Sequence, residues 1–278
     1  MPELPEVETV RRGLADRLIS FVIADVEVCR ERAIASPDGS RAFCEGLKGA
    51  EVGTWTRRGK YLMAELLPER GTWGVHLRMT GQFQWHSEPT EPCRHTRVRF
   101  WNSKDEELRF VDMRSFGEMW WVPPNEPIEN VITGLKQLGP EPFSPDFDAH
   151  HLKRRLKGST RPIKTALLDQ SLVAGVGNIY ADESLFAAGI NPMTPAGQLS
   201  FDRLKTLHLC LVDVLQTSIG AGGTTFSDFR DLEGMNGNYG GQAWVYRRNG
   251  HACRRCGTIL SRDKLSGRST HWCSSCQA

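Results

Sequence analysis

The sequence contains no apolar run long enough to span a membrane, and its first residues are acidic where a signal peptide would be basic. These absences argue against a membrane anchor and against a secretory leader. Internal repeats and low-complexity tracts are absent too. With 278 residues, 39% hydrophobic and 24% charged, the composition is typical of a soluble globular protein that is long enough for two domains. We expect the protein to remain in the cytoplasm.

The cysteines do not form the pattern of a disulfide framework. Four of the eight are scattered, whereas the other four form two Cys-x-x-Cys pairs with sixteen residues between the pairs. Two residues between paired cysteines let both thiolates reach one ion, and two such pairs complete a tetrahedral zinc site. Because four sulfurs leave no open coordination position, the zinc is expected to be structural. The predicted ligands are Cys253, Cys256, Cys273 and Cys276.

The net charge of +2 conceals an asymmetry along the chain. Residues 1–150 contain 19 Lys and Arg against 24 Asp and Glu, whereas residues 151–278 contain 16 against 9. The C-terminal half is therefore the better candidate for a surface that binds a polyanion. Surface charges that serve only solubility, distributed unevenly along the chain, would give the same counts.

The two halves also differ in their secondary-structure signals. Short segments rich in β-branched and aromatic residues are predicted strands at 21–28, 61–67, 73–79, 97–101, 108–111 and 118–122. Their regular spacing favours a β-sandwich or barrel. Pro and Gly accumulate between 123 and 145, where we expect a domain boundary. Helical patterns follow at 147–156, 163–169, 181–188 and 201–218. The chain is predicted to be α+β, with a β-rich half before a helical one.

The first eight residues can bring one amine and two carboxylates together. If Met1 is removed, the ring nitrogen of Pro2 becomes a secondary amine that can attack an electrophilic carbon and form an iminium. An apolar stripe at spacings of three and four predicts a helix that starts near Pro5, and its positive end would disfavour the ammonium form. Glu3, beside the amine, is a candidate general acid or base. An ordinary acidic first turn would have the same sequence.

The order of these motifs resembles the bacterial formamidopyrimidine-DNA glycosylases, which remove 8-oxoguanine and ring-opened purines from DNA. The resemblance rests on residues 2–12, on the Gly-rich turn at 175–183 and on the cysteine pairs. It implies a monomeric glycosylase and abasic-site lyase that acts on double-stranded DNA containing oxidised bases or abasic sites, associated with the nucleoid. It also implies an N-terminal β-sandwich with flanking helices, a helix-two-turn-helix domain and a β-hairpin zinc ribbon. The expected bounds are 1–125 for the sandwich, 126–145 for a linker, 146–241 for the helical domain with a lesion-covering loop, and 242–278 for the ribbon.

The same resemblance implies roles for five residues in catalysis. Pro2 would attack C1′ of the damaged nucleoside while Glu3 protonates the sugar ring oxygen. Glu6 would order the N-terminus and the lesion site. Lys60 would transfer protons during β-elimination, and Arg268 would bind a phosphate and assist δ-elimination.

DNA contacts follow from the resemblance as well. A flipped base leaves a gap in the duplex, and Met79, Arg114 and Phe116 are expected on loop tips as the wedge that fills it, with Arg114 facing the orphan base. Burial of Met79 and Phe116 in a core is the alternative. Asn178 is expected to bind phosphate and to cap a helix. The other implied contacts are His76, His95, Arg161 and Lys164.

Two features depart from the family pattern. Ser115 stands where a second basic residue is usual, so one phosphate contact is expected to be missing. The segment from Gly222 to Gly241 corresponds to the loop that covers the flipped purine, although its middle is variable. An endonuclease VIII-like enzyme for oxidised pyrimidines and a non-catalytic zinc-ribbon DNA-binding protein remain as rival interpretations. Leu4 and the long Gly-rich loop favour the purine enzyme.

Overall fold

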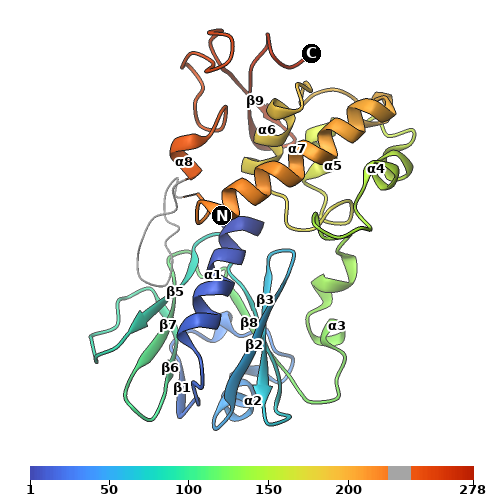
Figure 1. Ribbon diagram of the computed structural model, residues 1–278. Coiled ribbons are helices and arrows are strands. Elements are labelled where there is room, and N and C mark those ends of the chain that lie inside the picture. The colour runs from blue at the N-terminus through green and yellow to red at the C-terminus, as the bar shows by residue number, and fades with distance from the viewer. Residues whose placement is uncertain (225–238) are drawn as a thin grey trace. The chain divides into compact units, whose positions relative to one another are not determined.

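The computed structural model describes residues 1–224 and 239–278 (Figure 1). The chain divides into two compact units: Met1–Lys136 with Gly222–Asn238, and Gln137–Ala221 with Tyr239–Ala278. The first division, after Lys136, falls inside the Pro-rich segment. Among the described residues, no helix combines the length and the apolar character needed to cross a membrane.

Two antiparallel four-stranded sheets make up the first unit, in the orders β1-β6-β7-β5 and β2-β3-β4-β8. The first sheet contains β1 (Asp25–Val28), β5 (Gly81–His86), β6 (Thr96–Trp101) and β7 (Glu107–Asp112). The second contains β2 (Glu51–Arg58), β3 (Tyr61–Leu67), β4 (Gly71–His76) and β8 (Glu118–Val122). The helical segments of this unit are α1 (Leu4–Arg17), η1 (Glu31–Ala33), α2 (Gly39–Leu47), α3 (Ile128–Val131) and η2 (Thr133–Gln137).

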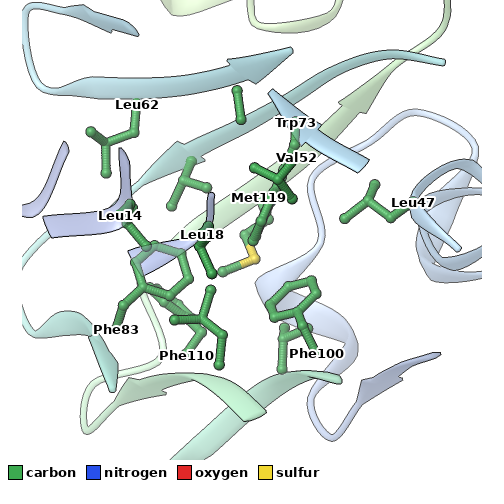
Figure 2. Packing of buried hydrophobic residues seen from close by; sticks show 14 of the residues in the cluster. Leu14, Leu18, Leu47, Val52, Leu62, Trp73, Phe83, Phe100, Phe110 and Met119 are labelled. Atoms are coloured by element: carbon green, nitrogen blue, oxygen red, sulfur yellow. The ribbon is translucent and has the colours of Figure 1, made fainter. Parts of the chain in front are cut away.

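The inner faces of the two sheets share one apolar core, which confirms the predicted sandwich (Figure 2). Trp73 of β4 and Phe100 of β6 meet across it with ring centroids 4.5 Å apart. Helix α1 adds Leu14, and its C-cap adds Leu18; Figure 2 shows both beside Phe83 and Phe110. The predicted apolar stripe of α1 is thus buried. The core fixes α1 against the sheets. The N-terminal turn of α1 carries the acidic residues of the candidate site.

The second unit is helical and ends in a β-hairpin. Its helices are α4 (Ala149–Leu156), α5 (Ile163–Leu167), α6 (Asn178–Ala187), η3 (Ala196–Gln198), α7 (Phe201–Gly220) and α8 (Tyr239–Gln242). Helices α6 and α7 pack together, and the hydroxyls of Tyr180 and Ser218 lie 2.6 Å apart at their contact. The hairpin joins β9 (Ser261–Leu265) to β10 (Arg268–Trp272). Ser266 and Gly267 both have positive φ, as a tight hairpin turn requires. The α+β class is confirmed.

Helix α7 is followed by a short described segment that lies with the first unit. The amide and the hydroxyl of Thr224 both bond to Glu6 of α1. This contact joins residues more than two hundred positions apart in the sequence.

Candidate active site and DNA interface

The N-terminal turn of α1 holds two buried carboxylates next to Pro2. Glu3 is the N-cap, and Glu3 and Glu6 form a capping box in which the Glu3 amide donates to Glu6 Oε2 over 2.8 Å. The side chains of Glu3 and Glu6 are 2% and 1% exposed, whereas Met1 is exposed. Pro2 is itself buried. Loss of Met1 would therefore leave a secondary amine directly beside Glu3, at the positive end of a helix.

The other oxygen of Glu6 holds the start of the predicted lesion-covering loop. Its Oε1 accepts from the amide of Thr224 over 2.8 Å and from the Thr224 hydroxyl over 2.9 Å. Gly223 has φ +80°, and a Cβ there would lie 3.0 Å from Glu6 Oε1. This position therefore requires glycine, both for its backbone and for the close approach. Residues 225–238 of the predicted loop lie outside the described residues.

Lys60 lies at the turn between β2 and β3 and is 8% exposed. Arg57 ties this turn to α1, because its guanidinium donates to the Gly59 carbonyl over 2.9 Å and pairs with Glu8 over 3.2 Å. Burial raises the pKa of Glu8, but hydrogen bonds from two arginines, Arg11 first, outweigh it and leave that pKa below its usual value. Glu8 therefore remains a carboxylate, and its ion pair links the Lys60 turn to the helix that carries Glu3.

His76, at the end of β4, is 8% exposed. Its Nδ1 accepts from the amide of Arg78 over 2.9 Å, which leaves the proton on Nε2. Burial lowers the pKa of His76 to about 3, and the nearby charges of Arg78 and Lys60 lower it further. The ring is neutral at physiological pH, so it can meet a phosphate as a hydrogen-bond donor but not as a cation.

The expected wedge residues lie on exposed loop tips of the first unit. Met79 and Phe116 are each 38% exposed, so the alternative that buries them in a core is wrong. The Arg114 guanidinium lies 4.8 Å from the centre of the Phe116 ring and is exposed as well. His95 is half-buried next to β6. An exposed apolar side chain beside a stacked guanidinium suits insertion between bases.

In the second unit, the four paired cysteines converge on one point. Their Sγ atoms all lie within 4.8 Å of one another, with Cys253 and Cys276 4.0 Å apart and Cys256 and Cys273 3.5 Å apart. Four thiolates around a tetrahedral zinc with bonds of about 2.3 Å would be separated by about 3.8 Å. The donor set and its spacing therefore fit zinc, with all four positions filled by protein.

Arg268 is the exposed first residue of β10, directly after the hairpin turn. Its neighbour Ser269 is held by Asn178, whose Nδ2 donates to the Ser269 carbonyl over 2.9 Å. The prediction that Asn178 caps α6 is wrong: Gly177 is the N-cap and Asn178 is the first helical residue. The Asn178 side chain fixes the hairpin next to Arg268 instead.

The structure also overturns the direct DNA contact expected of Lys164. This side chain is 1% exposed, and its Nζ lies 2.7 Å from Asp182 Oδ1. The ammonium also donates to the Ser269 carbonyl over 2.7 Å and to the Thr270 hydroxyl over 2.9 Å. A phosphate cannot reach an ammonium that is enclosed in this way, so Lys164 serves to hold β10. Arg161, by contrast, is exposed and pairs with Asp169 over 3.1 Å.

Three consecutive family descriptions match the chain. The formamidopyrimidine-DNA glycosylase N-terminal domain matches residues 1–119, and the H2TH domain of the same enzymes matches residues 138–230. The zinc finger found in FPG and IleRS matches residues 250–278. The chain belongs to the formamidopyrimidine-DNA glycosylase family.

Similar proteins extend over the full length of the chain. The formamidopyrimidine-DNA glycosylase of Parasynechococcus marenigrum is 74% identical over 277 residues and covers 100% of both chains. A variant of the Lactococcus lactis enzyme in complex with Fapy-dG-containing DNA is 34% identical, with a TM-score of 0.91 and 99% coverage of each chain. MutM bound to DNA with carbocyclic 8-oxo-G is 35% identical, with a TM-score of 0.90 and the same coverage. As in the zinc finger of the family, the four cysteines bind one zinc ion.

Two buried acids of this glycosylase were not predicted from the sequence. Asp182 Oδ2 accepts from the amide of His271 over 2.9 Å. Glu183 accepts from the amides of residues 244, 245 and 246 over 2.8 to 2.9 Å, and burial still raises its pKa. Both anchor the segment that carries the zinc site to α6. Both acids point inward because every residue of α6 from Ile179 to Phe186 is buried, although the run Asp182-Glu183-Ser184 by itself is typical of a solvated helix face.

Proposed function

We propose that this protein removes oxidised purines, including 8-oxoguanine and formamidopyrimidines, from double-stranded DNA and then cleaves the abasic site. The observation that carries the proposal is the burial of Glu3 and Glu6 beside Pro2 at the head of α1. A secondary amine next to a buried acid supplies the nucleophile and the proton donor that an imine mechanism needs. The family membership of the whole chain supports the same conclusion.

Base removal begins at C1′ of the damaged nucleotide. The Pro2 nitrogen attacks this carbon while Glu3 gives a proton to the sugar ring oxygen, which opens the ring. The base leaves with the electron pair of its glycosidic bond and takes up a proton. Because the proline nitrogen is secondary, the product is a positively charged iminium between Pro2 and C1′. Glu6 keeps this geometry through its bonds to the Glu3 amide and to Thr224.

Strand cleavage uses the iminium as an electron sink. Its positive charge acidifies the C2′ proton, whose removal expels the 3′ phosphate in β-elimination, and we assign proton transfer at this step to Lys60. A second elimination expels the 5′ phosphate and leaves a gap with phosphates at both ends. We assign Arg268 to the phosphate of this δ step, because it is exposed at the hairpin that the zinc site stabilises.

Each unit offers candidate contacts to DNA. Met79, Arg114 and Phe116 fill the gap left by the flipped base, while His76, His95, Arg161 and Asn178 are the remaining candidates for contacts to the duplex. As a monomeric enzyme that acts on the chromosome of a bacterium, the protein works in the cytoplasm on the nucleoid.

Paired duplexes test this function directly. One carries 8-oxoguanine opposite cytosine and the other thymine glycol opposite adenine, and the assay measures rates and end groups. We expect faster cleavage at 8-oxoguanine with phosphate at both ends, and loss of cleavage but not of binding in Pro2→Gly and Glu3→Gln. Glu88→Gln, at an exposed glutamate, is the matched control. Faster cleavage at thymine glycol would indicate an endonuclease VIII-like enzyme. Variants that behave like the parent would leave a non-catalytic DNA-binding protein.

A further inference from the structure

The loops that carry the wedge meet at one buried carboxylate. Asp112, the last residue of β7, is 0% exposed. One of these loops, at 77–80, connects β4 to β5 and bears Met79, whereas the other, at 113–117, connects β7 to β8 and bears Arg114 and Phe116. Both loops use a residue other than glycine in the left-handed region, at Arg78 and at Ser115, each with φ 52°. Such strained turns persist only where neighbouring contacts fix them.

Asp112 contacts both loops next to these turns. Its Oδ1 accepts from the Thr80 hydroxyl of one loop and from the Arg114 amide of the other, the latter over 3.1 Å. Its Oδ2 accepts from the Gly117 amide over 2.7 Å. The Thr80 hydroxyl oxygen also accepts from the Arg114 amide over 3.1 Å, so Thr80 joins the two loops directly.

The backbone of Asp112 extends the same arrangement to His95, another predicted DNA contact. Its amide donates to the His95 carbonyl over 2.9 Å. Its carbonyl accepts from Arg97 Nε over 2.8 Å, and the same guanidinium approaches His95 Nδ1 to 3.3 Å. The orientation of His95 is therefore coupled to that of the two wedge loops through one residue.

Gly117 of one loop and Gly81, directly after the other loop, lie against the ring of Phe110, which leaves the loops little freedom to adjust. A Cβ on Gly117 would come within 2.4 Å of this ring, and one on Gly81 within 2.7 Å. Above this ring, the polar bonds to Asp112 and Thr80 join the two loops to each other. Hydrogen bonds to a buried charged group are the stronger kind, and they lose strength steeply with distance and angle.

We propose that Asp112 and Thr80 are positioning residues that lock the two wedge loops together so that Met79, Arg114 and Phe116 enter the duplex as one unit. The inference rests on the proposed function, because it gives these residues their part in base flipping. Filling the gap left by a flipped base stabilises the flipped state, and a base in an intact stack needs this help more than an abasic sugar does. Loosening the loops therefore slows excision of a stacked lesion more than cleavage of a preformed abasic site.

Thr80→Val tests the link with the smallest change, because it keeps the shape of the side chain and removes only the hydroxyl. Thr80→Ser restores the hydroxyl. Thr56→Val, at an exposed strand threonine whose hydroxyl bonds to Met63, is the matched control. Asp112→Asn is the second variant, because the side-chain NH2 group of asparagine must then face the backbone N–H of Arg114 or of Gly117. Single-turnover rates are measured on 8-oxoguanine and abasic duplexes, with 2-aminopurine beside the lesion to report unstacking and urea midpoints to report folding.

We expect the ratio of 8-oxoguanine excision to abasic-site cleavage to fall about tenfold in Thr80→Val, the effect of one charge-assisted hydrogen bond. The 2-aminopurine signal should slow with it, and Thr80→Ser and Thr56→Val should keep the parent ratio. An unchanged ratio in both Thr80→Val and Asp112→Asn, or an equal fall of both rates, would overturn the inference. A parent protein that does not excise 8-oxoguanine would instead overturn the proposed function.

Discussion

Replacing Lys164 by methionine should destabilise the zinc hairpin without removing a DNA contact. The lysine Nζ lies 2.7 Å from Asp182 Oδ1, and the two side chains are 1% and 0% exposed. Methionine keeps most of the volume of the lysine stem, so the packing of α5 is largely retained. What the substitution leaves behind is a buried Asp182 carboxylate that has lost its cationic partner.

The magnitude follows from that lost partner. Removing one member of a buried ion pair costs about 3–5 kcal/mol, far more than the loss of a surface pair. The His271 amide still donates to Asp182 over 2.9 Å and offsets part of this cost. Asp182→Asn in the same chain removes the buried charge, so the double variant should be about 1–3 kcal/mol more stable than Lys164→Met alone.

Hydrogen exchange of the zinc-saturated protein measures the loss of hairpin stability locally. The amides of β9 and β10 report the opening of the hairpin, and the His271 amide reports the bond to Asp182 itself. Lys153→Met, at an exposed lysine of α4, is the control and should stay within about 0.5 kcal/mol of the parent. An opening free energy of the hairpin that is the same in Lys164→Met and in the parent would refute this account of the ion pair.

Salt dependence separates this role from the DNA contact that the sequence predicted. Each phosphate contact lowers the slope of log K against log salt by about 0.9. Lys164→Met should leave that slope unchanged, whereas Arg268→Met should lower the magnitude of the slope by about 0.9, the value for one phosphate contact. A smaller slope in Lys164→Met, together with a stable hairpin, would restore the DNA contact and contradict the burial argument.

Two further predictions concern protons and metal. Because burial lowers the pKa of His76 to about 3 while an unfolded histidine titrates near its ordinary value of 6.5, the unfolded state binds an extra proton below that pH. The stability that neutral His76 contributes is complete above pH 6.5 and is lost as pH falls toward 3. Between pH 7 and pH 5 the unfolding free energy of the parent, measured by urea titration, should therefore fall by about 2 kcal/mol more than that of His76→Gln. Removing zinc with a chelator, or substituting Cys273→Ser, should unfold the zinc ribbon and lower the affinity for duplex DNA at least about tenfold. The hydrogen-exchange protection of the strand amides in β3 and β4 should stay unchanged. Loss of protection in both units would contradict a purely local role of the zinc.

Local patterns in the sequence predicted much of the fold. The stripe of α1 and the spacing of the cysteines were decisive because each depends on residues only a few positions apart. Two strands, β2 and β5, were not predicted from the sequence. In β2 the alternation is broken by a register shift between Val52 and Trp55, and in β5 Gly81 and two glutamines replace strong strand formers. In both cases pairing with neighbouring strands overrides weak local preference.

The candidate site was harder to predict where its contacts join distant parts of the chain. Lys164 was expected at the DNA because it matches a basic position of the resembled family, but its partners Asp182 and Ser269 lie on α6 and β10. Asn178 looked like a helix cap for the same reason, since nothing nearby revealed that its amide reaches Ser269. Composition indicates that a lysine is available, whereas only the packing decides whether it faces DNA or the interior.

The central claim is that the nitrogen of Pro2 forms the covalent bond to DNA. Borohydride reduces an iminium to a stable amine, so it should trap the protein on a duplex with one 8-oxoguanine opposite cytosine. Mass spectrometry first establishes whether Met1 is absent. We predict a trapped complex for the form that starts at Pro2 and none for a form that retains Met1, whose Pro2 nitrogen is an amide. Equal trapping of both forms, or no trapping of the processed form despite tight binding, would contradict the role of Pro2.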